Sequence, residues 1–121
     1  MSAKPGPLAG VKVIACSTAQ AGTVPYMMMA DLGANVIKIE SPRGGDPSRT
    51  AGELVGDVGS FFETNNRGVK SVTLNLKTEE GRKIIYELVK DADVFGQNFR
   101  PGAAERNGIG YDQLKALNPA L

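Results

Sequence analysis

Short apolar runs alternate along the chain with segments that carry helix signals. The runs predict strands at 11–15, at 35–40, at 71–76 and within 92–99. Between the first two runs, and again between the last two, the intervening segment has the length and the capping residues of a helix. Strands that alternate with helices favour a mostly parallel sheet with right-handed crossovers and helices packed on it. The pattern therefore predicts the α/β fold class.

Two of the predicted helices carry an apolar stripe that is expected to pack on the sheet. The first begins near Pro25 and stops at Gly33, and the second is capped by Thr78. The stripes consist of Pro25, Met28, Met29 and Leu32 in the first helix and of Gly81, Ile84, Ile85 and Leu88 in the second. We expect the methionines to fill the core against the sheet.

The segment 41–60 interrupts this alternation with five glycines and two prolines. It is predicted to be a long loop, followed by a short helical turn at 61–66. Long loops in compact domains are usually functional or mobile. Two further short helices are predicted, one that starts at Pro101 and ends at Gly108, and one at 111–119.

Composition narrows the class of protein. The 121 residues suit one domain, and a net charge of +1 gives no general attraction to nucleic acid or membrane. No apolar run is long enough to span a bilayer and no signal peptide is evident, so a cytoplasmic protein is expected. The chain has no histidine, which excludes a Ser-His-Asp triad and a histidine-ligated metal. Cys16 is the only cysteine and is expected to be buried and inert, so no metal is predicted.

In an open α/β sheet, ligands bind outside the carboxyl ends of the strands. Those ends fall in the segments 17–22, 41–50, 75–77 and 98–102. The amide and cationic side chains on these segments are Gln20, Arg43, Arg49, Lys77, Asn98 and Arg100. The helix after Gly22 also directs its N-terminus at this rim, which favours an anion. The pattern indicates an anionic ligand such as a nucleotide phosphate, with solvated loop charges as the alternative.

A dinucleotide is the first ligand to consider. Glu40 ends the second strand where a ribose-binding acid would lie. After the first strand, however, Gly22 is the only glycine available to a pyrophosphate-binding loop, so a nicotinamide or flavin cofactor is not favoured. The carboxylates of Asp46, Asp57, Asp91 and Asp93 are candidate acid–base groups, but no neighbouring residue in the sequence marks any of them as tuned.

Several segments resemble, in order and at compatible spacing, the N-terminal part of the class III coenzyme A (CoA) transferases. They are PLAGVKVI, ADLGANVIKIESPRGGDPSR, NRGVKSVTLNLKTEEGRK and DADVFGQNFRPGAAERNGIGYDQLKALNP. That family includes formyl-CoA, carnitine-type and succinyl-CoA-dependent transferases, and also the α-methylacyl-CoA racemases. The resemblance covers roughly residues 7–119, which is nearly the whole chain.

The resemblance implies a set of CoA contacts. In the family a Gln-Ala pair in the first loop contacts CoA, and here that pair is Gln20-Ala21. The other matching positions are Leu74, Asn75, Leu76 and Lys77, then Asn98, Phe99 and Arg100, then Arg106. Lysine and arginine suit the phosphates, and Phe99 offers apolar surface to adenine. Two positions depart from the family pattern. Some transferases have an arginine at Ser41, and many members have an apolar residue or a glutamate where this chain has Gly96-Gln97.

The resemblance also implies an activity and a division of labour. We predict that residues 1–121 form the N-terminal, CoA-binding portion of a larger transferase domain, with a Rossmann-like, mostly parallel sheet that is incomplete here. The substrates would be an acyl-CoA and a carboxylic acid acceptor, and the full-length protein an interlocked homodimer. The family's catalytic aspartate lies beyond the region that matches Leu121, so no catalytic residue is assigned. An α-methylacyl-CoA racemase and a standalone CoA- or nucleotide-binding module remain the alternatives.

Overall fold

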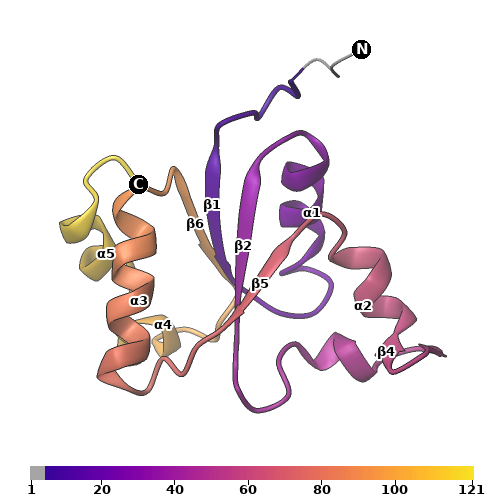
Figure 1. Ribbon diagram of the computed structural model, residues 1–121. Helices are drawn as coiled ribbons and strands as arrows, with labels where there is room; N and C mark the ends of the chain where they lie inside the picture. The colour runs from indigo at the N-terminus through magenta and orange to yellow at the C-terminus, as the bar shows by residue number, and fades with distance from the viewer. Residues whose placement is uncertain (1–4) are drawn as a thin grey trace.

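A parallel sheet lies between two layers of helices in the computed structural model, which describes residues 5–121 (Figure 1). The elements of the sheet and its helices are β1 (Lys12–Cys16), α1 (Val24–Asp31), β2 (Asn35–Glu40), β5 (Lys70–Thr73), α3 (Glu79–Lys90), β6 (Val94–Gln97), α4 (Ala103–Arg106) and α5 (Tyr111–Leu117). Between β2 and β5 the chain forms a 3-10 turn (Pro47–Thr50), a small hairpin of β3 (Leu54–Val55) and β4 (Val58–Gly59), and α2 (Ser60–Asn65).

The four-stranded sheet has the order β5-β2-β1-β6, and every neighbouring pair in it is parallel. This confirms the predicted α/β class with a mostly parallel sheet. The order reverses between β1 and β6, because β2 and β5 lie on one side of β1 and β6 on the other. Parallel strands present all their carboxyl ends at one edge, which is the lower edge in Figure 1. The loops that follow β1, β2, β5 and β6 therefore meet there.

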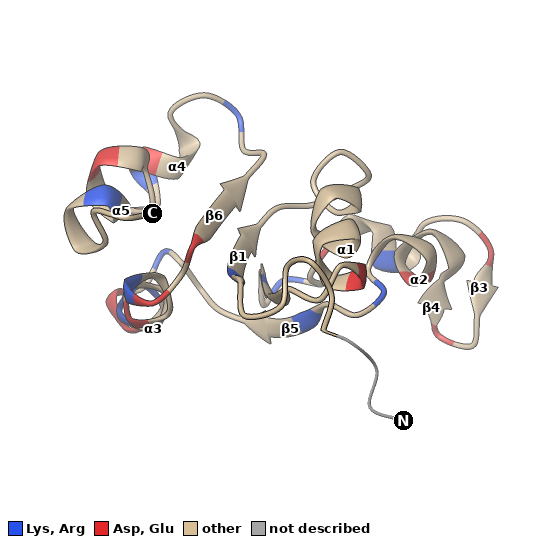
Figure 2. Ribbon diagram, turned by 90° about the horizontal axis from the view of Figure 1, so that it is seen from above, with Lys and Arg blue, Asp and Glu red and all other residues tan. Residues whose placement is uncertain are grey.

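Both faces of the sheet are covered, since alternate residues of each strand pack on opposite layers. Val13 and Val36 pack on the side of α1, whereas Ile14 and Ile39 pack on the side of α3, α4 and α5. Ile85 of α3 is fully buried in that second cluster. Both signs of charge lie along α3 (Figure 2), on the part of the helix that faces solvent.

The expectation that the methionines of α1 fill the core is wrong for Met28, which is 55% exposed, and Leu32 is 45% exposed. Met29 alone of the predicted stripe packs, partly buried, against the cluster of Val13 and Val36. The helix is apolar around most of its circumference, so periodicity does not single out the face that meets the sheet.

The predicted stripe of α3 is also partly wrong. Its buried residues are Gly81, Ile85 and Val89, whereas Ile84 is 47% exposed. Residues four apart form one ridge of a helix, and Ile84 lies about 100° around the axis from Ile85. The ridge through Ile85 points at the sheet, which leaves Ile84 at the margin of the interface.

The third strand is shorter than predicted, and its end forms a turn. β5 stops at Thr73, and Asn75 accepts hydrogen bonds through its side chain from the Lys77 amide (3.1 Å) and through its carbonyl from the Thr78 amide (3.1 Å). The Thr78 hydroxyl then caps α3, as predicted, by accepting from the Gly81 amide at 3.2 Å. The turn directs Asn75 and Lys77 toward the edge where the strands end.

A buried polar cluster ties the segment after β2 to the sheet. The carboxylate of Glu40, at the end of β2, accepts from Arg49 Nε (2.8 Å), Arg49 Nη2 (2.7 Å), Ser71 Oγ (2.6 Å) and the Asp46 amide (2.9 Å). Asp46 in turn forms a buried ion pair with Lys38 of β2. Lys38 also donates to Asn66 at 2.8 Å. Residues 41–50 are therefore not the free loop that their glycines and prolines suggested.

Hydrogen bonding dominates the electrostatics of this cluster. Burial by itself would raise the pKa of Glu40, but the hydrogen bonds from Arg49, Ser71 and the Asp46 amide outweigh it and lower the pKa from 4.5 to about 2. Burial opposes ionisation of Asp46 in the same way, yet its hydrogen bonds, with that from Lys38 foremost, lower its pKa below the ordinary value. Both carboxylates are therefore charged at neutral pH.

Ile85→Ala is expected to lower the free energy of unfolding by about 2–5 kcal/mol, because a fully buried side chain is removed and a cavity remains. Ile84→Ala, one residue away and exposed, should change it by less than about 0.5 kcal/mol. Urea denaturation followed by circular dichroism compares the two. Equal destabilisation by both variants would contradict the packing of α3 described above.

The stability of the chain should fall in acid because of Glu40. A carboxyl whose pKa is lowered on folding stabilises the fold fully above its unfolded pKa, and that contribution is lost as pH falls from about 4.5 toward about 2. A shift of this size corresponds to about 3 kcal/mol. Glu40→Gln should remove this part of the pH dependence of the urea midpoint. Glu53→Gln, at the exposed position just before β3, should leave it in place.

Candidate functional site

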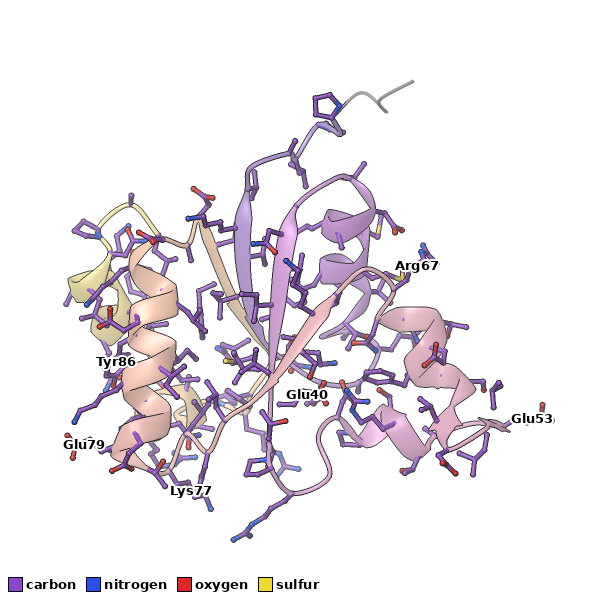
Figure 3. All side chains as sticks on the ribbon, in the orientation of Figure 1. Glu40, Glu53, Arg67, Lys77, Glu79 and Tyr86 are labelled. Carbon is purple, nitrogen blue, oxygen red and sulfur yellow. The ribbon has the colours of Figure 1, made fainter. Side chains whose placement is uncertain are left out.

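A crevice of about 180 Å³ lies where the strands end, as the rule for open α/β sheets predicts. Its walls come from the ends of β1, β2 and β5 and from the segment that follows β6. Glu40 and Lys77, labelled in Figure 3, lie toward this end of the sheet. A larger cavity of about 340 Å³ lies beside β6 and α5, and none of the predicted site residues lines it.

The structure brings half of the predicted site residues together. The residues of the predicted set that line the crevice are Leu74, Asn75, Leu76, Lys77 and Phe99. The predicted residues that do not line it are Gln20, Ala21, Asn98, Arg100 and Arg106, all of which are exposed. Asn107 also lines the crevice and was not predicted. The side-chain amide of Asn107 donates to the Ala103 carbonyl at 2.8 Å. The sequence around Asn107 shows only that a helix ends there.

Asn98 has a structural role that the sequence did not reveal. Its side-chain oxygen accepts from the Thr18 amide at 3.0 Å, and its side-chain nitrogen donates to the Thr18 carbonyl at 2.8 Å. This pair of bonds joins the loop after β1 to the segment after β6, at the point where the strand order reverses. A Cβ at Gly22 would lie 2.5 Å from the same Asn98 nitrogen. The single glycine of this loop therefore makes room for Asn98 beside the backbone of the loop.

The loop after β1 does not have the form of a dinucleotide-binding turn. Ala19 occupies the left-handed region at φ 58°, and the Gln20 carbonyl accepts from the amides of Thr23 (3.2 Å) and Val24 (3.1 Å). The Ser17 hydroxyl donates to the Gly22 carbonyl. Gln20 and Ala21 remain exposed on the outside of this compact turn.

The cations near the crevice fall into two groups. Arg49 is bound through two nitrogens to Glu40 and stacks on the ring of Phe62, 3.9 Å from its centroid. It is held by these contacts, unlike the free rim cation that the sequence suggested. The second group comprises Arg43, Lys77, Arg100 and Arg106, which are exposed and, within residues 5–121, form no ion pair. These four are available to an anionic ligand.

The pairing of Glu40 also bears on the dinucleotide alternative. A ribose-binding acid must accept hydrogen bonds from the ligand. Both Glu40 oxygens are already occupied by Arg49, Ser71 and the Asp46 amide. Glu40 is therefore held by the protein and is not free to bind the ribose of a dinucleotide.

The departure of Gly96 from the family pattern has a packing reason. A Cβ at Gly96 would lie 1.6 Å from the hydroxyl oxygen of Tyr26, so the tyrosine of α1 occupies the space above this strand position. Gln97, beside it, accepts from the Phe99 amide at 2.6 Å and shapes the turn that follows β6. The nearby Cys16 is buried, as predicted, and burial raises the pKa of its thiol to about 12.

No three histidine, cysteine, aspartate or glutamate side chains within residues 5–121 lie close enough together to hold a metal ion. None of the helices in this range combines the length and the apolar character required to cross a membrane.

Comparison with known proteins identifies the family to which the chain belongs. Residues 8–121 match the family model described as CoA-transferase family III. The chain is 46% identical over 120 residues to an acetyl-CoA:oxalate CoA-transferase of Acetobacter aceti. The match covers 98% of this chain and 31% of that protein. It is 43% identical to an acyl-CoA transferase of Fusarium pseudograminearum, over 99% of this chain and 28% of the relative.

Solved structures agree with the sequence comparison. A CAIB/BAIF family protein from Brucella suis superposes with a TM-score of 0.87 at 40% identity, over 95% of this chain and 32% of that one. Rv3272 from Mycobacterium tuberculosis gives a TM-score of 0.89 at 38% identity, over 97% and 33% of the two chains. The chain thus spans about a third of the length of these structures. On its fold, and on the match of residues 8–121, the chain belongs to CoA-transferase family III.

Proposed function

We propose that this chain binds the nucleotide end of CoA for an enzyme that moves CoA from an acyl-CoA to a free carboxylate. The observation that carries the proposal is the crevice at the carboxyl ends of the strands, lined by Leu74, Asn75, Leu76, Lys77 and Phe99. Membership of CoA-transferase family III supports an acyl-CoA as the ligand. The relatives named above are transferases, which favours transfer over racemisation.

The chemistry of the rim suits the ligand. The adenosine diphosphate half of CoA offers an apolar base and several phosphate charges. Leu76 and Phe99 supply apolar surface within the crevice, and Lys77 lies beside them. Arg100 and Arg106 lie exposed on the segment that follows β6. Cations without a protein partner form charge-assisted hydrogen bonds with phosphate at little cost in broken contacts.

The chemical step is assigned to residues outside this chain. In the proposed reaction a carboxylate of the enzyme attacks the thioester carbonyl of the acyl-CoA. This forms a mixed anhydride between the enzyme and the acyl group, and the CoA thiolate is the leaving group. The thiolate then attacks the enzyme's carbonyl, which releases the donor acid and gives an enzyme–CoA thioester. The acceptor carboxylate attacks that thioester, and the thiolate finally attacks the resulting anhydride at the acceptor's carbonyl, which gives the new acyl-CoA and regenerates the enzyme's carboxylate.

The buried carboxylates of this chain are poorly suited to that role. Glu40 is bound by Arg49, and Asp46 is bound by Lys38. A carboxylate held in such a pair has a lowered pKa, which weakens it as a nucleophile. The homodimer and the cytoplasmic location expected from the sequence stay predictions.

Lys77→Ala or Arg100→Ala in the complete gene product should weaken CoA binding about tenfold or more, because each removes a charge-assisted contact with phosphate. Isothermal titration calorimetry with CoA measures the effect. Lys90→Ala is the matched control, since Lys90 is exposed at the far end of α3 and pairs with Glu87. Affinities that match the wild type for both site variants would remove these residues from the proposed site.

The 121-residue chain alone is expected to show no CoA transfer and no racemisation. It contains no histidine, and its buried carboxylates are held in ion pairs. The assay supplies several acyl-CoA donors and carboxylate acceptors and detects new acyl-CoA by mass spectrometry. Turnover that persists through rigorous purification would show that a catalytic group lies within this chain.

A further inference from the structure

The loop after β1 contains one residue in an unfavourable backbone conformation. Ala19, at φ 58°, is the one residue other than glycine that has a positive φ within residues 5–121. This region is disfavoured for L-residues because Cβ comes close to the following carbonyl oxygen. Ala19 directly precedes Gln20-Ala21, so its conformation sets the direction in which the chain continues into that pair.

Side chains hold the peptide groups on both sides of Ala19. Its amide donates to Asp46 Oδ1 at 3.2 Å, and its carbonyl accepts from the Thr23 hydroxyl at 2.6 Å. Asn98 holds the preceding residue, Thr18, through both its amide and its carbonyl. The loop is therefore held by two bonds to Asn98 at its start, by the Thr23 hydroxyl at its end, and by Asp46 between them.

Asp46 is rigidly placed to provide that contact. Its side chain is fully buried, and the same Oδ1 also accepts from the Ser48 amide (2.9 Å) and the Ser48 hydroxyl (2.7 Å). Lys38 donates to the other oxygen, Oδ2. Because Lys38 belongs to β2, the position of the carboxylate is determined by the sheet. Asp46 does not line the crevice, so its side chain can act on a ligand there only through the residues that it holds, which are Ala19, Ser48 and Lys38.

We propose that Asp46 is a positioning residue that holds Ala19 in the left-handed conformation and so presents Gln20-Ala21 to the ligand. Its bearing on CoA affinity rests on the function proposed above. The bond from Ala19 to Asp46 offsets the backbone preference of alanine. Without it, Ala19 relaxes toward the right-handed or extended region, and the orientation of the exposed Gln20-Ala21 pair changes.

The test distinguishes the effect of losing the oxygen that accepts from Ala19 from the effect of losing the negative charge of Asp46. Lys38→Met is combined with Asp46→Asn in one double variant and with Asp46→Ala in another, so that neither leaves a buried lysine unpaired. Asparagine retains the oxygen that accepts from Ala19, whereas alanine does not. Both are measured in the complete gene product by calorimetric titration with CoA.

We expect the Lys38→Met/Asp46→Asn variant to bind CoA within about threefold of the wild type. The Lys38→Met/Asp46→Ala variant should bind about tenfold more weakly, since a hydrogen bond to the loop is lost. Adding Ala19→Gly to the alanine variant should restore most of that loss, because glycine adopts a positive φ without support. Asp57→Asn, on the exposed β3–β4 hairpin, is the control for an Asp-to-Asn change and should leave affinity unchanged.

Restoration by Ala19→Gly is the outcome that a purely structural role for Asp46 would not produce. Equal affinities for the Asn and Ala double variants, or failure of Ala19→Gly to restore binding, would overturn the proposal. If the double variants do not fold, Ala19→Val decides in the wild-type background. Valine is strongly disfavoured at this φ, and Ala19 is exposed, so affinity should fall about tenfold with the Lys38–Asp46 pair intact. Unchanged affinity would then overturn the proposal.

A second measurement tests the positioning role independently of the proposed function. If the wild type does not bind CoA, the proposed function fails, and amide hydrogen exchange at Ala19 decides the positioning role. The Ala19 amide should exchange about tenfold faster in the alanine double variant than in the asparagine double variant, because only the latter retains its acceptor. The Val13 amide in the sheet serves as the internal reference. Equal exchange at Ala19 in both variants would overturn the positioning role.

Discussion

The buried Lys38–Asp46 ion pair is the interaction on which the geometry of the crevice depends. Both side chains are almost fully removed from solvent, which carries a large desolvation cost unless every polar atom is satisfied. Here that condition is met, because Asp46 accepts from Lys38, Ser48 and Ala19, and no buried side-chain polar atom in residues 5–121 lacks a partner. The pair therefore links β2 to two loops at once.

Polar side chains at the end of the sheet mostly bind other parts of the protein. Glu40, Arg49 and Asn98 each resemble ligand-binding residues in the sequence, and each is engaged by the chain itself. Their bonds fix the loops after β1, β2 and β6 relative to one another. A crevice made from loops gains precision when such contacts hold the loops in place before a ligand arrives.

The residues proposed to bind CoA form a consistent set. Lys77, Arg100 and Arg106 are exposed and have no ion-pair partner in residues 5–121, while Leu76 and Phe99 supply apolar surface nearby. A rim of free cations beside an apolar wall suits a nucleotide whose base and phosphates have opposite requirements. The fold thus shares the strand order of dinucleotide-binding proteins without their glycine-rich turn, and a compact turn bonded to Asn98 takes its place.

The alternation of apolar runs determined the α/β class, the parallel sheet and the edge where the crevice lies. These features depend on local periodicity and on the rule that parallel strands end together, so the sequence suffices for them. The same rule already selected Lys77, and the family resemblance added apolar residues of the crevice wall, such as Leu74 and Phe99, which the structure brings together with it.

Only the tertiary structure decided which polar residues are free and which face of a helix is buried. Arg49 and Arg100 look alike as loop arginines, and they differ because Glu40 lies beside one and no acidic partner in residues 5–121 lies beside the other. Asp46 looked like an ordinary loop carboxylate until the fold placed it between Lys38 and the amide of Ala19, which is far from it in the sequence. Met28 is exposed although its stripe predicted a core residue, because α1 is apolar on most sides and the sheet contacts only one of them. Pairings between distant residues leave no periodic trace in the sequence, since they depend on how the elements pack.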